Sequence, residues 1–174
     1  QEGQNWESLA SAVHHGLSEI TVVVDHNKIQ SDTWVSLVND LGDLESKFRA
    51  FGWYVTRCNG HDLNAFSACL DDCRVITDRP QIIIADTVKG QGVSFMADTS
   101  NLDTEQLYQY HSGAPNVEDY VRASDELTEA ANEQLQSLGA GQLELEQSPL
   151  QPRTTVDNPQ RLIDAYSRAL VTQA

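Results

Sequence analysis

Residues 20–27 read Ile-Thr-Val-Val-Val-Asp-His-Asn, a short run of β-branched side chains that ends in three polar ones. β-Branched residues favour strands, and a run of this length suits a strand that is buried on both faces. Strands of that kind belong to parallel sheets, whose faces are covered by helices. The run therefore predicts a strand of a parallel sheet that leads into a polar loop.

Helical and strand patterns alternate around this run. Apolar residues spaced three and four apart predict a helix over residues 5–15, and a second helix ends at Gly52. Two further strands are predicted over residues 53–58 and 81–86, with Asp62 between them as the N-cap of a helix. The apolar side of that helix consists of Leu63, Phe66, Leu70 and Cys73. This alternation predicts an α/β fold with a doubly wound, mostly parallel sheet.

The second part of the chain is richer in loop-forming and polar residues and lacks the regular alternation of strands and helices. A Gly-rich loop and an irregular stretch follow residue 88, and residues 117–138 predict a polar helix. Residues 139–159 have the composition of an interdomain linker, and residues 161–170 predict the start of a new amphipathic helix. Because the chain opens on Gln1 without a leader and stops within a helical pattern, both ends are expected to be cuts in a longer protein.

The charge balance restricts the class of partner. The formal net charge is −15, from 26 acidic and 11 basic residues, which excludes nucleic acid and anionic membrane surfaces as main partners. The apolar runs are too short to span a membrane. Three cysteines, an odd number, favour reduced thiols and a cytoplasmic location.

Three loops follow the predicted strands, at residues 25–33, 59–62 and 87–92. Ligands of open α/β sheets bind beyond the carboxyl ends of the strands, where such loops lie. In the first loop, the amide oxygen of Asn27 and the backbone carbonyl of Ile29 are hard oxygen donors of the kind that Mg²⁺ prefers. On composition alone the better interpretation is a polar turn, in which Asn and Asp accept backbone hydrogen bonds.

Several blocks in this chain resemble transketolases. They are Gln1-Glu2-Gly3-Gln4-Asn5-Trp6-Glu7, Asp25-His26-Asn27-Lys28-Ile29, Phe48-Arg49-Ala50-Phe51-Gly52-Trp53, Asn59-Gly60-His61-Asp62, residues 85–96 and His111-Ser112-Gly113-Ala114-Pro115. They occur in the order that the family has, and several ordered blocks are more specific than any single motif. The resemblance implies the thiamin-diphosphate-binding fold, present as a partial domain.

The resemblance assigns domains and a metal site. Residues 1–115 would be the C-terminal part of the cofactor-binding domain, 116–156 a helical connection and linker, and 157–174 the start of the pyrimidine-binding domain. Asn27 would bind Mg²⁺ (or Ca²⁺) through its side chain and Ile29 through its carbonyl. The third ligand, an Asp of a Gly-Asp-Gly element, would lie just upstream of Gln1.

The resemblance also assigns four other side chains. Glu2 and Glu7 match acidic residues near the dimer interface that link two active sites, although carboxylates early in a helix also complement its dipole. Lys89 matches a lysine of the Lys-Gly-x-Gly loop beside the cofactor, and His111 matches a histidine that faces the cofactor and the donor sugar. The chain departs from the family pattern at Thr33, where Gly is common, and at Ser112, which puts donor specificity in doubt.

One constellation suggests a different chemistry. Cys58, His61, Cys69 and Cys73 have a spacing that superficially suggests zinc. Cys69 and Cys73, however, continue an apolar helical stripe, which is typical of core residues. We therefore expect the two thiols in the core and no zinc.

The implied activity is transfer of a two-carbon ketol unit between sugar phosphates of the pentose phosphate pathway, by a homodimer with thiamin diphosphate. The alternatives are 1-deoxyxylulose-5-phosphate synthase, a 2-oxoacid dehydrogenase subunit, or a non-catalytic subunit that retains the fold. The glutamate that activates the cofactor in this family belongs to the next domain, so the 174-residue chain alone is expected to be inactive.

Overall fold

A computed structural model describes residues 2–102 and 106–145 of the chain. The chain divides into two units, residues 1–142 and 143–174, and the helices and strands of the described residues all lie in the first. The helix predicted over 161–170 and the domain start predicted over 157–174 lie outside the described residues. Within the described residues, no helix is both long enough and apolar enough to cross a membrane.

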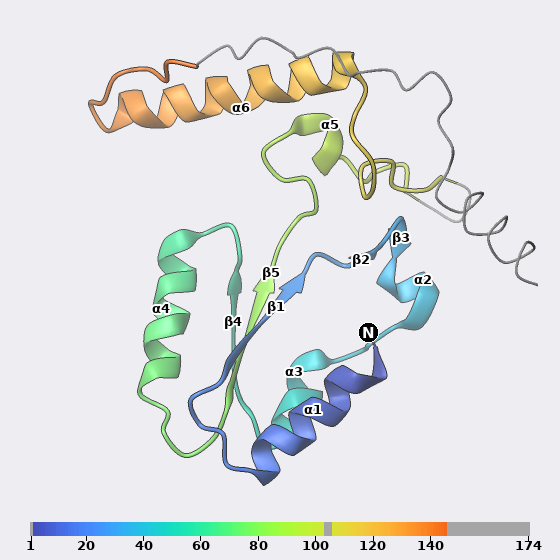
Figure 1. Ribbon diagram of the computed structural model, residues 1–174, viewed down its shortest axis with the longest axis vertical. Coiled ribbons are helices and arrows are strands. Elements are labelled where there is room, and N and C mark those ends of the chain that lie inside the picture. Colours follow the sequence, from blue (N-terminus) through green and yellow to red (C-terminus); the bar gives the residue numbers. More distant parts are fainter. Residues whose placement is uncertain (1, 103–105, 146–174) are drawn as a thin grey trace, which may run out of the picture. The chain divides into compact units, whose positions relative to one another are not determined.

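The centre of the fold is a parallel sheet of three strands in the order β1-β5-β4 (Figure 1). The strands are β1 (Thr21–His26), β4 (Tyr54–Asn59) and β5 (Gln81–Asp86). Ile82, Ile83 and Ile84 of the middle strand have no exposed surface, as expected for a strand covered on both faces. His26 and Asn59 both pair in register with Asp86, so the three carboxyl ends lie level. The predicted α/β class and parallel sheet are confirmed.

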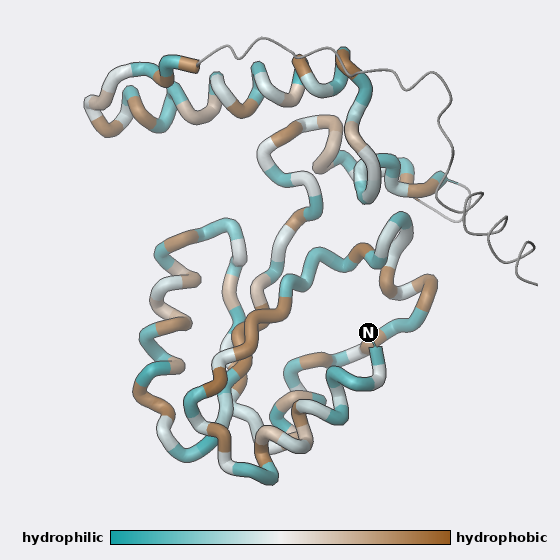
Figure 2. The backbone as a smooth tube through the Cα atoms, in the orientation of Figure 1, coloured by the Kyte–Doolittle hydropathy of each residue, from teal (hydrophilic) through white to brown (hydrophobic). Residues whose placement is uncertain are grey.

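Helices cover both faces of this sheet. α1 (Gly3–His14) and α3 (Leu44–Ala50) lie on one face and α4 (Leu63–Arg74) on the other (Figure 1). The hydrophobic colouring is concentrated on the central strands, and the helices alternate between polar and apolar residues (Figure 2). On the first face, Trp6 stacks on Phe48 with ring centroids 5.6 Å apart, and the indole N–H of Trp53 donates to the Leu9 carbonyl at 3.0 Å.

The start of α4 confirms one prediction and corrects another. The Asp62 carboxylate accepts hydrogen bonds from the backbone N–H groups of Asn64 and Ala65, at 2.9 and 3.0 Å, and so caps the helix as predicted. Leu63 was predicted on the buried side, but 81% of it is exposed. The reason is its position, because the helix begins where the strands end and its first residue extends past the sheet.

Short elements lie where the sequence predicts only loops. β2 (Ile29–Gln30) and β3 (Thr33–Trp34) form an antiparallel hairpin, followed by α2 (Val35–Asn39), and α5 (Ser94–Ala97) interrupts the irregular stretch after β5. The polar helix is present as α6 (Val117–Ser137). The Glu126 carboxylate of α6 accepts from the backbone N–H of Ser94 at 2.6 Å, which joins α6 to the start of α5.

Candidate functional site

The three loops predicted at the carboxyl edge of the sheet do meet there. The N–H of Gly60 donates to the Asp86 carbonyl at 2.7 Å, and the Thr87 hydroxyl donates to the Asp25 carboxylate. The Lys89 ammonium donates to the backbone carbonyl of Ser31 at 2.7 Å. Segments far apart in the sequence are thus joined by direct hydrogen bonds at one edge.

Asn27 lies directly after β1 in a hydrogen-bonded turn. Its amide oxygen accepts from the N–H of Ile29 at 2.9 Å, and its amide nitrogen donates to the Asp25 carboxylate at 3.0 Å. Lys28 between them has φ of 67°, a left-handed conformation that is uncommon for a residue with a side chain. The turn has the hydrogen bonds that the composition predicts. An amide oxygen has two lone pairs, however, so this bond leaves one for a ligand.

The carbonyl of Ile29 points away from the hairpin partner. Opposite pairs in an antiparallel ladder alternate between exchanging backbone hydrogen bonds and exchanging none. The N–H of Val35 donates to the Lys28 carbonyl at 2.8 Å, which makes that pair hydrogen-bonded. The next pair, Ile29 opposite Trp34, is therefore the kind that exchanges no backbone hydrogen bonds, and its N–H and C=O groups point outward from the hairpin. The hairpin does not use the Ile29 carbonyl, while the Ile29 side chain, 7% exposed, anchors the turn in the core.

Asn27 and Ile29 line an open hollow of about 490 Å³ beside the end of β1. Glu2 lines the same hollow, at the N-cap of α1, and its carboxylate accepts from the Gln4 amide. Glu7 is exposed on α1 and does not line it. The structure thus brings Glu2 together with the two predicted metal ligands and separates Glu7 from them.

Lys89 and His111 contact each other. The Lys89 ammonium lies 3.0 Å from Nδ1 of His111 and 4.7 Å from the ring centre of Tyr108. Burial lowers the pKa of Lys89 from its ordinary value, while the carboxylates of Asp32 and Asp25 act in the opposite direction. Tyr108, 8% exposed, was not predicted as a site residue because its surroundings in the sequence have no pattern.

An ammonium group donates hydrogen bonds but accepts none. The contact with Lys89 therefore makes Nδ1 of His111 the acceptor and puts the proton of the neutral ring on Nε2. The imidazole consequently presents an N–H donor on the side away from Lys89.

A charged network that the sequence does not predict crosses the ends of the strands. The Arg57 guanidinium donates to both oxygens of the Asp86 carboxylate, at 2.6 and 2.8 Å, and His26 Nδ1 lies 2.7 Å from one of them. The hydrogen bonds from Arg57, reinforced by His26, hold the pKa of Asp86 at about 2. The only signal in the sequence is an acidic residue at the end of a buried strand.

Replacing Asp86 by Asn is expected to lower the free energy of unfolding at pH 7 by about 1 kcal/mol, since the group is partly exposed and solvent screens the interaction. A carboxylate with a lowered pKa contributes its full stability above the unfolded value near 4. That contribution shrinks below pH 4 and is lost as pH falls through the folded value of about 2, so the difference between the two proteins should be clearly smaller at pH 2.5 than at pH 7. Denaturant unfolding at pH 7 and pH 2.5 measures this. Asp71→Asn, in an exposed pair with Arg74, is the control and should change little.

Comparison with known proteins gives the family. Residues 1–123 match the family described as "Transketolase, thiamine diphosphate binding domain". The chain belongs to this family. The transketolase-family chain is 35% identical over 94 residues to a 6-deoxy-6-sulfo-D-fructose transketolase subunit of a Clostridium species, covering 54% of the chain and 34% of that relative. It is 27% identical over 128 residues to an apulose-4-phosphate transketolase subunit of Phocaeicola vulgatus, covering 74% of the chain and 43% of that relative.

Solved transketolases share the fold. The transketolase of Campylobacter jejuni matches 81% of this chain with a TM-score of 0.52 and 20% identity. The transketolase of Leishmania mexicana matches 79% of this chain with a TM-score of 0.51 and 20% identity. The matches cover 25% and 23% of those two proteins. The transketolase-family chain therefore spans between about a quarter and somewhat under half of the length of these relatives.

The cysteines of this transketolase-family chain lie in the core. Cys69 and Cys73 are buried against Ile83, as predicted, and Cys58 packs against the same cluster. Burial raises the pKa of Cys58 to about 11 and also raises the pKa of Cys73 above its ordinary value. The part of the chain that the structure describes contains no group of three or more His, Cys, Asp or Glu arranged for a metal.

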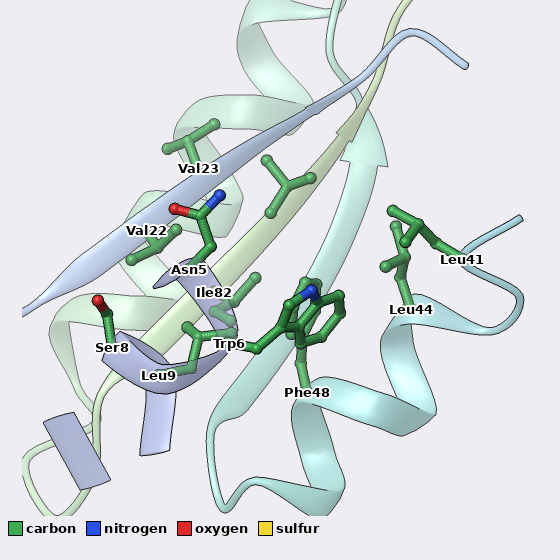
Figure 3. A pocket seen from close by; sticks show the side chains of 11 residues that line it. Asn5, Trp6, Ser8, Leu9, Val22, Val23, Leu41, Leu44, Phe48 and Ile82 are labelled. Atoms are coloured by element: carbon green, nitrogen blue, oxygen red, sulfur yellow. The ribbon is translucent and has the colours of Figure 1, made fainter. Parts of the chain in front are cut away.

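A second hollow, of about 390 Å³, lies between α1, α3 and β1 (Figure 3). Its lining is dominated by apolar side chains such as Trp6, Val22 and Phe48, and the described residues that line it include no ionisable group. The ionisable and metal-binding types of side chain considered above instead line the hollow beside Asn27 or belong to the Lys89–His111 pair.

Proposed function

We propose that the chain is part of a transketolase-type enzyme, which transfers a two-carbon ketol unit from a ketose phosphate to an aldose phosphate with thiamin diphosphate and Mg²⁺ or Ca²⁺. One observation carries this proposal. Two oxygen donors, Asn27 and Ile29, and a Lys89–His111 pair occur at the same edge of the sheet in a chain of this family.

The donor set fits a hard divalent cation. The Asn27 amide oxygen has a second lone pair, and the Ile29 carbonyl is directed away from its hairpin. Mg²⁺ commonly takes few ligands from protein and the rest from phosphate and water. We assign the third protein ligand to the Asp of a Gly-Asp-Gly element preceding Gln1. When bound, thiamin diphosphate supplies the electron sink that allows a bond beside a ketose carbonyl to break.

Lys89 and His111 have distinct roles in this proposal. The Lys89 ammonium offsets charge on the diphosphate and fixes the His111 ring through Nδ1. The Nε2–H of His111 then donates to a hydroxyl of the donor sugar, or to the oxygen on which charge develops.

Glu2 and Glu7 are assigned to the interface of a homodimer whose active sites lie between subunits. In this proposal the two carboxylates, both exposed, face the partner. Residues 1–115 are the C-terminal part of the cofactor-binding domain. The edge position of β1, whose outer side has no strand partner in the described residues, and the 49% exposure of Val23 on one face of the sheet support further structure beside β1. The free thiols support a cytoplasmic location.

The test is an assay of the whole protein, with any partner subunit that it has, after treatment with a chelator. Ketol transfer should require both thiamin diphosphate and Mg²⁺. Cofactor binding without turnover would favour a non-catalytic subunit. Turnover of a 2-oxoacid, or 1-deoxyxylulose-5-phosphate synthesis, would favour the other thiamin-dependent classes. Absence of cofactor binding would overturn the proposal.

A further inference from the structure

We propose that His61 is a positioning residue that fixes the loop of residues 87–92, and with it the ammonium group of Lys89. The inference rests on the proposed function, in which Lys89 faces the diphosphate. His61 is itself not among the residues assigned above to the metal or the sugar. It acts through one hydrogen bond, from the N–H of Val88 to its ring nitrogen Nε2, at 2.7 Å.

The turn that carries His61 lies directly against the start of this loop. A Cβ atom on Gly60 would lie 2.5 Å from the Thr87 side chain and 3.2 Å from the Asp86 carbonyl, so only glycine allows this approach. At this short distance the N–H of Gly60 donates a hydrogen bond to the same Asp86 carbonyl, at 2.7 Å. The β4–α4 turn and the end of β5 are therefore in backbone contact.

The His61 ring projects from a well-anchored turn. Its backbone N–H donates to the Asn59 side-chain oxygen at 3.0 Å, and the next residue, Asp62, caps α4. A ring held in this way can support a neighbouring loop. Because Nε2 accepts from Val88, the ring proton of the neutral imidazole is on Nδ1.

The supported N–H belongs to the residue directly before Lys89. At its other end, the Lys89 side chain contacts the Ser31 carbonyl, the His111 ring and the face of Tyr108. These contacts set the direction of the ammonium group, whereas the Val88 bond sets the point from which the side chain starts. Loss of that bond should shift or loosen Lys89 without removing its charge.

The expected effect is that of one hydrogen bond acting through Lys89. His61→Leu should raise the Kd for thiamin diphosphate about fivefold, with a smaller change in kcat. His61→Gln, whose amide oxygen also accepts, should recover part of the loss. His14→Leu replaces an exposed histidine of α1 in the same way and is the matched control, with no change in Kd expected.

A double-mutant cycle in the whole protein tests whether the effect passes through Lys89. In a Lys89→Met background, His61→Leu should add no further loss of affinity, because coupled residues are not additive. An equal loss in both backgrounds, or no loss in either, would overturn the proposal. A residue with a merely structural role would weaken both proteins alike.

Amide hydrogen exchange of residues 87–92, without ligand, separates this inference from the proposed function. His61→Leu should speed exchange there and leave β5 unchanged, because the bond at Val88 is local. If the wild-type protein binds no thiamin diphosphate, the proposed function fails and exchange alone decides on His61. Unchanged exchange in the loop would then show that His61 does not hold it.

Discussion

Replacing Asn27 by Ala is expected to weaken Mg²⁺-dependent binding of thiamin diphosphate about a hundredfold, since a metal ligand is lost together with the bonds that orient its neighbours. The amide oxygen accepts from the N–H of Ile29, and the amide nitrogen donates to Asp25. Alanine removes the proposed ligand and also frees the turn that aims the Ile29 carbonyl. Calorimetric titration of the whole protein with cofactor, at several Mg²⁺ concentrations, measures the loss.

Two further variants separate the ligand from the turn. Asn27→Asp keeps an oxygen that accepts from Ile29 and can bind a hard cation, so it should retain Mg²⁺-dependent binding. Asn64→Ala removes the same side chain from the exposed first turn of α4 and should leave binding unchanged. If Asn27→Ala binds cofactor and Mg²⁺ as the wild type does, the metal site assigned here is wrong.

The scaffold of the site was predictable because its signals are local. Three consecutive β-branched apolar residues, Ile82 to Ile84, predict a strand buried on both faces, and they form the middle strand. Asp62 stands one residue before an apolar periodicity and caps that helix. The level ends of the strands then follow from parallel pairing, which is why three loops far apart in the sequence were expected to meet.

Other parts of the site depend on contacts that leave no local signal. The β2–β3 hairpin has two residues in each strand, which is too few to show a periodicity in the sequence. In its turn the residue with a positive φ, of 54°, is Ser31 and not a glycine, so the sequence has no glycine that would indicate the turn. The Asp86 network joins His26 and Arg57, which are 60 and 29 residues away in the sequence. Only the register of the strands brings such residues together. Asn27 and Lys89 were assigned from family motifs rather than from these contacts.

The largest effect expected outside the metal site is that of Lys89→Met. It should raise the Kd for thiamin diphosphate by one to two orders of magnitude, because a charge-assisted contact with the diphosphate is lost from a partly buried position. It should also lower kcat, since the ammonium group that holds Nδ1 of His111 is removed. Methionine keeps the approximate length of the side chain, so the variant mainly removes the ammonium group, including its contact with the face of Tyr108.

The pH dependence of the wild-type protein gives an independent measurement. Burial lowers the pKa of Lys89, so the ammonium group loses its proton at a lower pH than an exposed lysine does. Affinity for thiamin diphosphate should therefore fall as pH rises through that pKa, and Lys89→Met should lack this alkaline loss.

Lys47→Met is the matched control, because Lys47 is exposed and also donates to a backbone carbonyl, that of Leu41. An alkaline loss that persists in Lys89→Met would mean that a different group binds the diphosphate, and Lys89 would then be a structural link between Ser31, Tyr108 and His111.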